Sequence, residues 1–259
     1  MPELPEVERA ARRLEAAARG KVIVELRVLH PSLARRLPAE LAATVRGRRI
    51  AAVERRGKHQ LLRLDDGSAL HVHFRMSGDW VVGHQGGTEE RHARAVLELS
   101  DGTRISLVDS RALATLTLHA PGEDPLPQLG PEPFSAAFTA DALGRALAHR
   151  RGAIKPALLD QRVVAGVGNI YAAEALWLAR ISPRAMAARL GPARRERLVR
   201  AIRQVLRRAP AARYADRDVR ARWRVYDREG RPCRRCGAPV ARIVQSGRST
   251  YFCPRCQRP

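Results

Sequence analysis

The sequence of 259 residues carries 48 Lys and Arg residues against 26 Asp and Glu residues, which gives a formal net charge of +22. A positive field attracts polyanions, so the charge favours nucleic acid as the partner. The alternative is that the arginines are scattered over the surface and only aid solubility. The hydrophobic content of 45% excludes a disordered chain, and the length allows two domains. No apolar run approaches the roughly 18 residues of a membrane span, and the acidic start does not resemble a secretory signal, so we expect a cytoplasmic protein without membrane contact.

The first residues are Met1-Pro2-Glu3-Leu4-Pro5-Glu6-Val7-Glu8. Removal of Met1 exposes the secondary amine of Pro2, and an α-amino group, whose pKa is roughly 7.7 to 8.0, is partly neutral and nucleophilic in the cell. Its attack on an aldehyde carbon gives an iminium, and Glu3 stands beside it as a carboxyl group that can shuttle protons. The alternative is an ordinary helix start, because residues 5–19 have a helical pattern that ends at Gly20.

Short runs rich in Val, Ile and Leu follow the first helix and predict strands. Asp-Asp-Gly at 65–67 and Ser-Asp-Gly at 100–102 are typical of hairpin turns between them. We therefore expect a two-layer β domain over residues 1–120, and a linker over the Pro-rich and Gly-rich residues 121–134. The predicted strands are 22–28, 60–64, 69–74, 94–99 and 104–108.

The chain after the linker has helical periodicity, which predicts a helical domain over residues 135–230. Gly166, Gly168 and Asn169 stand directly before one of its helices. Asn169 can cap that helix, and exposed amides at a helix N-terminus bind phosphate, although most such stretches are only tight turns. The predicted helices are 141–150, 155–159, 170–179 and 192–208.

Among the basic residues, only Lys21, Lys58 and Lys155 are lysines. Lys can carry a proton to and from a reacting centre, whereas Arg stays charged, so each retained Lys is a candidate for chemistry. Lys58 lies at a Gly turn before an apolar run, and Lys155 lies at the start of a predicted helix. Chance placement of three lysines is the alternative.

The last 29 residues, 231–259, contain all the cysteines of the chain, as Cys233-x2-Cys236 and, after sixteen intervening residues, Cys253-x2-Cys256. This spacing is typical of a four-thiolate structural zinc site, and disulfides are improbable in a cytoplasmic protein. The segment also has seven arginines and no acid. We expect one structural zinc ion that holds a hairpin against DNA.

His71 and His73 alternate along one predicted strand, which could suggest a metal site. No third cluster of ligands matches them, so packing or hydrogen bonding is the favoured interpretation. Met76, beside the turn Ser77-Gly78, has the character of an apolar wedge that fills the space of an extruded base.

Together these motifs resemble the bacterial formamidopyrimidine-DNA glycosylases, relatives of endonuclease VIII, over essentially the whole chain. Leu4 and Val7 favour the formamidopyrimidine branch. The resemblance implies an α+β protein, with an N-terminal two-layer β-sandwich with flanking helices and a C-terminal helix-two-turn-helix domain with a four-Cys zinc finger hairpin. The matching motifs are the first eight residues, Gly57-Lys58, His73 with Met76-Ser77-Gly78, residues 129–133, residues 153–156, residues 167–172 and the cysteine finger with Arg248.

The resemblance also implies a function and the roles of single residues. A monomeric enzyme of base excision repair would act on double-stranded DNA with damaged bases or abasic sites, in a bacterial cytoplasm and at the nucleoid. Pro2 would be the nucleophile that forms a Schiff base, with Glu3, Lys58 and Arg248 as further catalytic residues in β- and δ-elimination. The DNA-binding residues would be Met76, His92, Arg111, Leu113, Arg151, Lys155 and Asn169.

Three departures from the family pattern concern substrate choice. Leu113 replaces the usual Phe wedge, and Ala93 and Arg94 replace an acid and a His after His92. The segment 209–224 lacks the Gly/Thr-rich loop that caps 8-oxoguanine in many relatives. Formamidopyrimidines and 8-oxoguanine are the expected substrates, and the alternatives are oxidised pyrimidines or abasic sites on the same fold, or a DNA-binding protein without catalysis.

Overall fold

The computed structural model describes residues 1–209 and 222–258, and the chain folds as two compact units. The first unit holds Met1–Pro2 and Glu6–Pro127, and the second holds Glu3–Pro5 and Gln128–Pro259. The loop prediction for 209–224 falls largely on residues outside the described ones. Among the described helices, none is long and apolar enough to cross a membrane.

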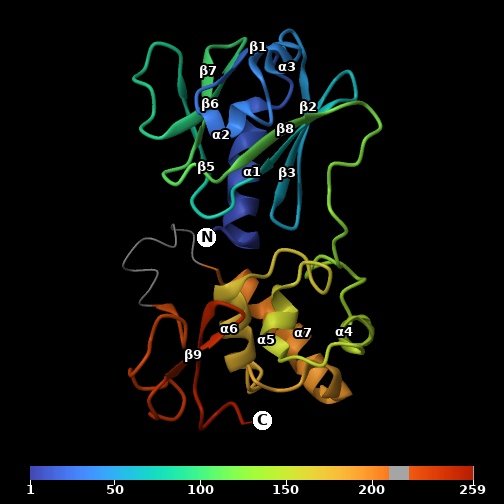
Figure 1. The fold of residues 1–259 in the computed structure, drawn as a ribbon, viewed down its shortest axis with the longest axis vertical. Coiled ribbons are helices and arrows are strands. Elements are labelled where there is room, and N and C mark those ends of the chain that lie inside the picture. The colour runs from blue at the N-terminus through green and yellow to red at the C-terminus, as the bar shows by residue number, and fades with distance from the viewer. Residues whose placement is uncertain (210–221, 259) are drawn as a thin grey trace. The chain divides into compact units, whose positions relative to one another are not determined.

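The first unit is built from two antiparallel sheets of four strands each. Figure 1 shows how the strands of these sheets are arranged. One sheet has the order β1-β6-β7-β5, and the other has the order β2-β3-β4-β8. The strands are β1 (Ile23–Val28), β2 (Ile50–Arg56), β3 (His59–Leu64), β4 (Ala69–His73), β5 (Asp79–His84), β6 (Ala93–Leu99), β7 (Thr103–Val108) and β8 (Thr115–His119).

Helix α1 (Leu4–Ala18) belongs to the core of the first unit through one apolar face. Val7, Ala10 and Leu14 recur at helical spacing and are buried with the inner faces of the sheets, including Leu62 and Ile105. The unit therefore has one continuous hydrophobic core. Two short helices, α2 (Pro31–Ala34) and α3 (Ala39–Ala43), lie in the connection between β1 and β2.

The second unit is helical and ends in a two-stranded hairpin. Leu4, at the start of α1, packs in its core with the apolar faces of its helices. The elements are α4 (Ala140–Leu147), α5 (Ile154–Leu159), α6 (Asn169–Leu178), η1 (Ala187–Arg189), α7 (Pro192–Arg207), β9 (Ala241–Gln245) and β10 (Arg248–Phe252).

The α+β class and the antiparallel two-layer β domain are confirmed. The predicted strands and helices all occur, with ends that differ by at most three residues, and β2, β5 and β8 are further strands that the apolar runs did not indicate. The division into 135–230 and 231–259 stays a prediction, because the contacts separate only two units.

Candidate active site and zinc centre

Glu3 is held on the N-terminus of α6. Its carboxylate accepts N–H groups from Gly168 at 2.8 Å, Ile170 at 2.8 Å and Tyr171 at 3.3 Å, and its side chain is 1% exposed. An ionised carboxylate only accepts, so it suits the unpaired amides and positive end of a helix. A Cβ on Gly168 would lie 2.4 Å from the Glu3 carboxyl carbon, so only glycine permits this approach.

This arrangement corrects the expectation for Asn169 and for the helix amides. Gly168, not Asn169, is the N-cap residue of α6, and no side chain caps the helix from that position. The amides expected to receive phosphate are instead occupied by Glu3, which lies 165 to 168 positions earlier in the chain than the residues that donate to it. The Asn169 side chain instead accepts from Lys155 Nζ through its Oδ1 atom and donates to the Ser249 carbonyl through its Nδ2 atom.

Lys155 is 1% exposed and joins α5 to α6 and β10. Its Nζ donates to the Oδ1 atom of Asn169, to Thr250 Oγ1 at 2.8 Å and to the carbonyl of Ser249 at 3.3 Å. Burial lowers the pKa of Lys155, the charge of Glu3 opposes this and the charge of Arg248 adds to it, so that the pKa is about 8. The ammonium therefore lies in a field shaped by two predicted catalytic residues of the second unit.

Arg248 lies at the tip of the hairpin of β9 and β10. It pairs with Gln245 across a two-residue turn, Ser246-Gly247, whose φ angles are 48° and 70°. Positive φ at both positions is typical of the type I′ turn, whose twist matches that of paired strands. The exposed Arg248 side chain is thus carried on a rigid element, and Asn169 Nδ2 binds the next residue of the hairpin, donating to Ser249 O at 3.1 Å.

The four cysteines form one group whose sulfur atoms all lie within 4.8 Å of one another. A tetrahedral zinc ion with Zn–S bonds of about 2.3 Å requires spacings of this size. Trp177 of α6 donates its Nε1–H to Cys233 Sγ at 3.4 Å, a contact that orients a ligand. Cys233, Cys236, Cys253 and Cys256 fit a closed structural zinc site, and the site ties the hairpin to α6.

Lys58 and Pro2 both belong to the first unit. Lys58 follows Gly57 in the turn between β2 and β3 and is 7% exposed, and Pro2 is half-buried just before α1. Burial lowers the pKa of both His59 and His73, and the charge of Lys58 adds to this effect.

Asp109 organises the loops that carry the predicted wedge residues. Its carboxylate accepts the N–H groups of Leu113 at 2.6 Å, Ala114 at 2.7 Å and Arg111 at 3.2 Å, and the hydroxyl of Ser77. Burial raises the pKa of Asp109, but the Ser77 hydroxyl and these three amides outweigh it, so the net pKa is lowered.

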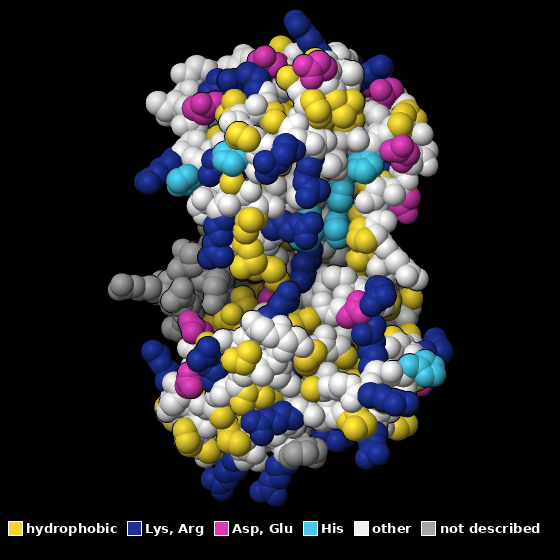
Figure 2. Space-filling model, in the orientation of Figure 1, with side chains coloured by type: hydrophobic (Ala, Val, Ile, Leu, Met, Phe, Trp, Pro, Cys, Tyr) yellow, Lys and Arg dark blue, Asp and Glu magenta, His cyan; other side chains and the backbone are white. Residues whose placement is uncertain are grey.

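The loops presented by Asp109 are exposed at the wedge positions. Met76 is 39% exposed and Leu113 is 49% exposed, and Arg111 is exposed as well. His92 and Arg151 are also exposed, in the first and second unit respectively, and His92 has a left-handed backbone with φ 68°. Figure 2 shows Lys and Arg side chains spread over the face of both units that it presents.

Histidines form a connected group on the β2-β3-β4-β8 sheet, and Figure 2 shows histidine side chains gathered in this unit. His59 Nδ1 lies 2.8 Å from His71 Nε2, and the ring centroids of His59 and His73 are 4.7 Å apart. His119 contacts His71 edge-on and hydrogen-bonds Thr117 at 2.9 Å. Across the described ranges, only the cysteines meet the geometry of a metal site, so the hydrogen-bonding interpretation of His71 and His73 is favoured.

Sequence reasoning missed Asp109, Thr250 and Glu174. Asp109 follows the last residue of β7, where an Asp before a turn is a signal for side-chain hydrogen bonds to the backbone. Glu174 is 1% exposed and accepts the N–H groups of Arg224, Val225 and Tyr226 at 2.9 to 3.0 Å. A buried acid amid apolar helix residues was its only sequence signal.

Comparisons with known proteins cover the chain with three family models. Residues 1–116 match the formamidopyrimidine-DNA glycosylase N-terminal domain, residues 129–215 match the formamidopyrimidine-DNA glycosylase H2TH domain, and residues 230–259 match the zinc finger found in FPG and IleRS. The formamidopyrimidine-DNA glycosylase of Chloroflexus aurantiacus is 44% identical over 99% of this chain and 98% of its own. That of Paracoccus denitrificans is 43% identical, with both chains fully covered.

Solved structures agree with the sequence comparisons. The Lactococcus lactis enzyme bound to DNA with an AP site has a TM-score of 0.90 at 30% identity, and covers 99% of this chain and 100% of its own. MutM in complex with DNA that contains carbocyclic 8-oxo-G has a TM-score of 0.91 at 32% identity, with full coverage of both chains. The chain belongs to the formamidopyrimidine-DNA glycosylase family.

Proposed function

We propose that this protein is a bifunctional DNA glycosylase and AP lyase of base excision repair, which excises formamidopyrimidines and 8-oxoguanine from double-stranded DNA through a Schiff base on Pro2. The observation that carries the proposal is the buried Glu3 carboxylate, fixed by three backbone N–H groups of the α6 N-terminus. Pro2 is its covalent neighbour, so the residue after the nucleophile is held in one position. Such a fixed pair favours chemistry over an ordinary helix start.

The reaction divides between the amine and the proton carriers. The neutral amine of Pro2 attacks C1′ of the damaged nucleotide, and the base departs with the electrons of the glycosidic bond. Ring opening gives an iminium between Pro2 and C1′, and loss of a C2′ proton then expels the 3′ phosphate. Glu3 receives and returns protons at the sugar, and Lys58 donates a proton. A second elimination expels the 5′ phosphate, with Arg248 at that cut.

Lys155 is the residue that positions Asn169 for DNA. Because Lys155 Nζ takes the Oδ1 atom of Asn169, the amide nitrogen faces Ser249 and keeps a second N–H proton for a phosphate oxygen. Asn169 and Arg248 grip the phosphates that flank the lesion, and His92, Arg111 and Arg151 contact the DNA further away. Met76, Arg111 and Leu113 fill the space left by the extruded nucleotide.

The zinc ion has a structural part in this scheme. Four thiolates leave no open coordination position for substrate, so the ion holds the hairpin that carries Arg248. We place the protein in a bacterial cytoplasm, associated with the nucleoid when bound to DNA, and expect it to act as a monomer.

Borohydride trapping tests the proposal directly, because reduction converts the iminium to a stable cross-link. Duplexes with 8-oxoguanine, a formamidopyrimidine, an oxidised pyrimidine or an abasic site are each incubated with the protein and borohydride. We expect cross-links on the purine lesions and on the abasic site. Intact mass must first show that Met1 is removed, because a retained Met1 blocks the amine.

Variants identify the nucleophile. Pro2→Gly and Lys58→Ala should each lower strand cleavage by roughly a hundredfold or more, the usual size of a lost catalytic group. Pro5→Ala, a change in the same N-terminal segment, is the matched control and should cleave as the unaltered protein does. A cross-link to the abasic duplex alone would favour the altered-specificity alternative that Leu113 suggests. Unchanged cleavage in both catalytic variants would contradict the assignment of Pro2 and Lys58.

A further inference from the structure

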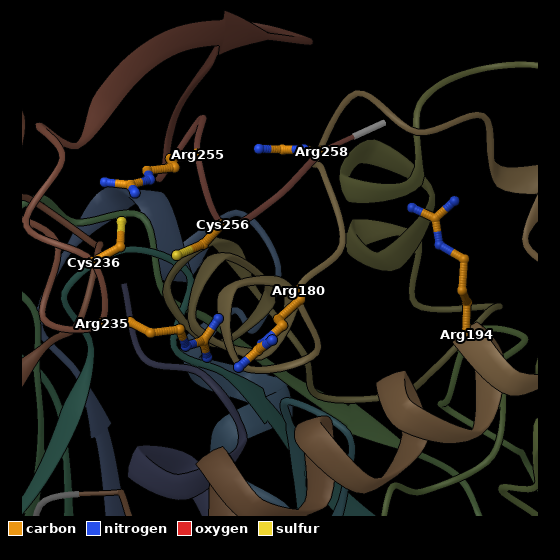
Figure 3. A pocket seen from close by; sticks show the side chains of 7 residues that line it. All are labelled: Arg180, Arg194, Arg235, Cys236, Arg255, Cys256 and Arg258. Carbon is orange, nitrogen blue, oxygen red and sulfur yellow. The ribbon is translucent and has the colours of Figure 1, made fainter.

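A pocket in the second unit is lined almost wholly by arginines, as Figure 3 shows. Its volume is about 490 Å³, which is within the range of small-ligand sites. Ordinary ligand pockets are mostly apolar, whereas here the other lining residues are the zinc ligands Cys236 and Cys256. The arginines are Arg180, Arg194, Arg235, Arg255 and Arg258.

The pocket lies at the end of α6 that is opposite to the predicted active-site residues. Asn169 is the first residue of α6, and Arg180 follows its last turn. A rise of roughly 1.5 Å per residue puts about 16 Å between these two positions along the helix. The arginine pocket is therefore separate from the site formed by Glu3, Lys155 and Arg248.

One of the arginines, Arg235, is fixed before any ligand binds. The guanidinium of Arg235 lies 4.1 Å from the ring centroid of Trp177 and donates to the Trp177 carbonyl at 3.2 Å. Arg180 has a left-handed backbone with φ 57°, which turns the chain out of α6. In Figure 3 the side chains of Arg180 and Arg235 lie close to each other on one side of the pocket. A fixed donor loses little entropy on binding an anion.

The charge of the pocket exceeds what its surroundings neutralise. Zinc with four thiolates carries a charge of about −2, and a helix C-terminus adds roughly −0.5. Against these stand the five arginines that line the pocket. No carboxylate of the described residues forms an ion pair with any of them. An excess of more than two positive charges remains, although like charges held this close repel one another.

Planar guanidinium groups bind phosphate oxygens in pairs, which makes arginine the preferred side chain for phosphate. We propose that this pocket binds a compact anion with two or more phosphate groups, at a site separate from the lesion site. The phosphates come either from a free oligophosphate or nucleotide, or from the backbone of a second DNA segment. Because the pocket lacks an exposed aromatic ring among its lining residues, it recognises the phosphates rather than a base.

Calorimetric titration with inorganic tripolyphosphate tests the proposal. We expect one binding site, and an affinity at least about tenfold lower in the variant Arg180→Gln/Arg194→Gln/Arg258→Gln, which keeps the arginines next to the cysteines. The matched control Arg35→Gln/Arg36→Gln/Arg46→Gln removes the same charge from exposed positions of the first unit, and should bind within about twofold of the unaltered protein.

Two measurements guard against other causes. Zinc content after titration detects removal of the ion by tripolyphosphate, which would affect the pocket and control variants equally. Arg258→Gln alone changes an exposed residue, so it should lower affinity several-fold without disturbing the fold. Equal losses in the pocket and control variants, or no saturable binding, would overturn the proposal.

A third titration distinguishes the two sources of phosphate. The protein is first saturated with an uncleavable abasic-analogue duplex, and then receives either tripolyphosphate or a second, undamaged duplex. Binding of tripolyphosphate alone indicates a free oligophosphate, and binding of the second duplex that the pocket variant loses indicates DNA. Strand cleavage on the lesion duplex should be unchanged in the pocket variant, so this result is independent of the catalytic assignment.

Discussion

Replacing His71 should change how the stability of the first unit depends on pH. Burial, together with neighbouring cationic or histidine side chains, lowers the pKa of His59 and of His71 to about 4, and that of His73 to about 3. The groups that act on these rings are Lys58, Arg75 and His119. The unfolded chain binds a proton at each ring near pH 6.5, while the folded chain does so only near pH 4 or below. Folding stability is therefore lost as the pH falls through this window.

The size of the effect follows from the two pKa values. A histidine that shifts from about 6.5 to about 4 costs roughly 2 kcal/mol at pH 5 and almost nothing at pH 7.5. In His71→Val this penalty disappears, but the 2.8 Å hydrogen bond to His59 is lost, at about 1 kcal/mol. The variant should thus be about 1 kcal/mol less stable than the unaltered protein at pH 7.5, and about 1 kcal/mol more stable at pH 5.

Urea unfolding at pH 5, 6 and 7.5 measures this crossing, with circular dichroism of the strands as the signal. The first unit holds eight of the described strands, so its transition dominates that signal. His84→Gln, at an exposed position of β5, is the control and should keep the pH dependence of the unaltered protein. Parallel curves for His71→Val and the unaltered protein would refute burial as the cause of the lowered pKa.

Two further predictions concern buried carboxylates. Asp109→Asn should destabilise the first unit by about 2 kcal/mol, because an amide N–H₂ group replaces the oxygen that accepts the N–H groups of Leu113 and Ala114. Hydrogen exchange of residues 110–114 measures this loss of stability, and unchanged protection of these residues would contradict the prediction. Glu174→Gln should lower the free energy of unfolding by roughly 2 to 3 kcal/mol, because Glu174 accepts the backbone N–H groups of residues 224–226 just before the zinc finger. The variant should also release zinc to a chelator faster. An unchanged release rate would show that these hydrogen bonds do not support the zinc site.

Much of the fold could be predicted from local patterns, because the spacing of apolar residues matches the repeat of either a helix or a strand. The apolar stripe of α7, with Leu198, Ile202 and Val205, predicts a helix within one residue of its observed end. The strand β2 was not indicated, since its segment Ile50–Arg56 has two Ala residues and ends in three charged ones. The segment forms a strand because it pairs with β3, and whether a segment pairs depends on its partner strand as well as on its own residues.

The candidate site was predictable to the extent that its residues lie in short motifs. The spacing of the four cysteines was enough to predict a zinc site, and the order of Pro2 and Glu3 at the start of the chain was enough to select them as candidates. Asn169 could not be placed, because the acceptor that displaces it from the cap is a carboxylate far away in the sequence. Asp109 is visible in the sequence as a loop residue. Its role in organising the loops depends in part on a hydrogen bond from Ser77, which belongs to another turn and could not be paired with Asp109 from the sequence.

The second unit gathers opposite charges around the first turn of α6, and this explains why a buried lysine is useful there. Glu3 neutralises the positive end of the helix, and Lys155 balances Glu3 while it fixes the amide of Asn169. Arg would fill the position of Lys155 with a larger group that stays fully charged, whereas a lysine whose pKa is about 8 can adjust its protonation when phosphate approaches. At this buried position beside Arg248 a permanent second charge would be costly, which favours a lysine over an arginine.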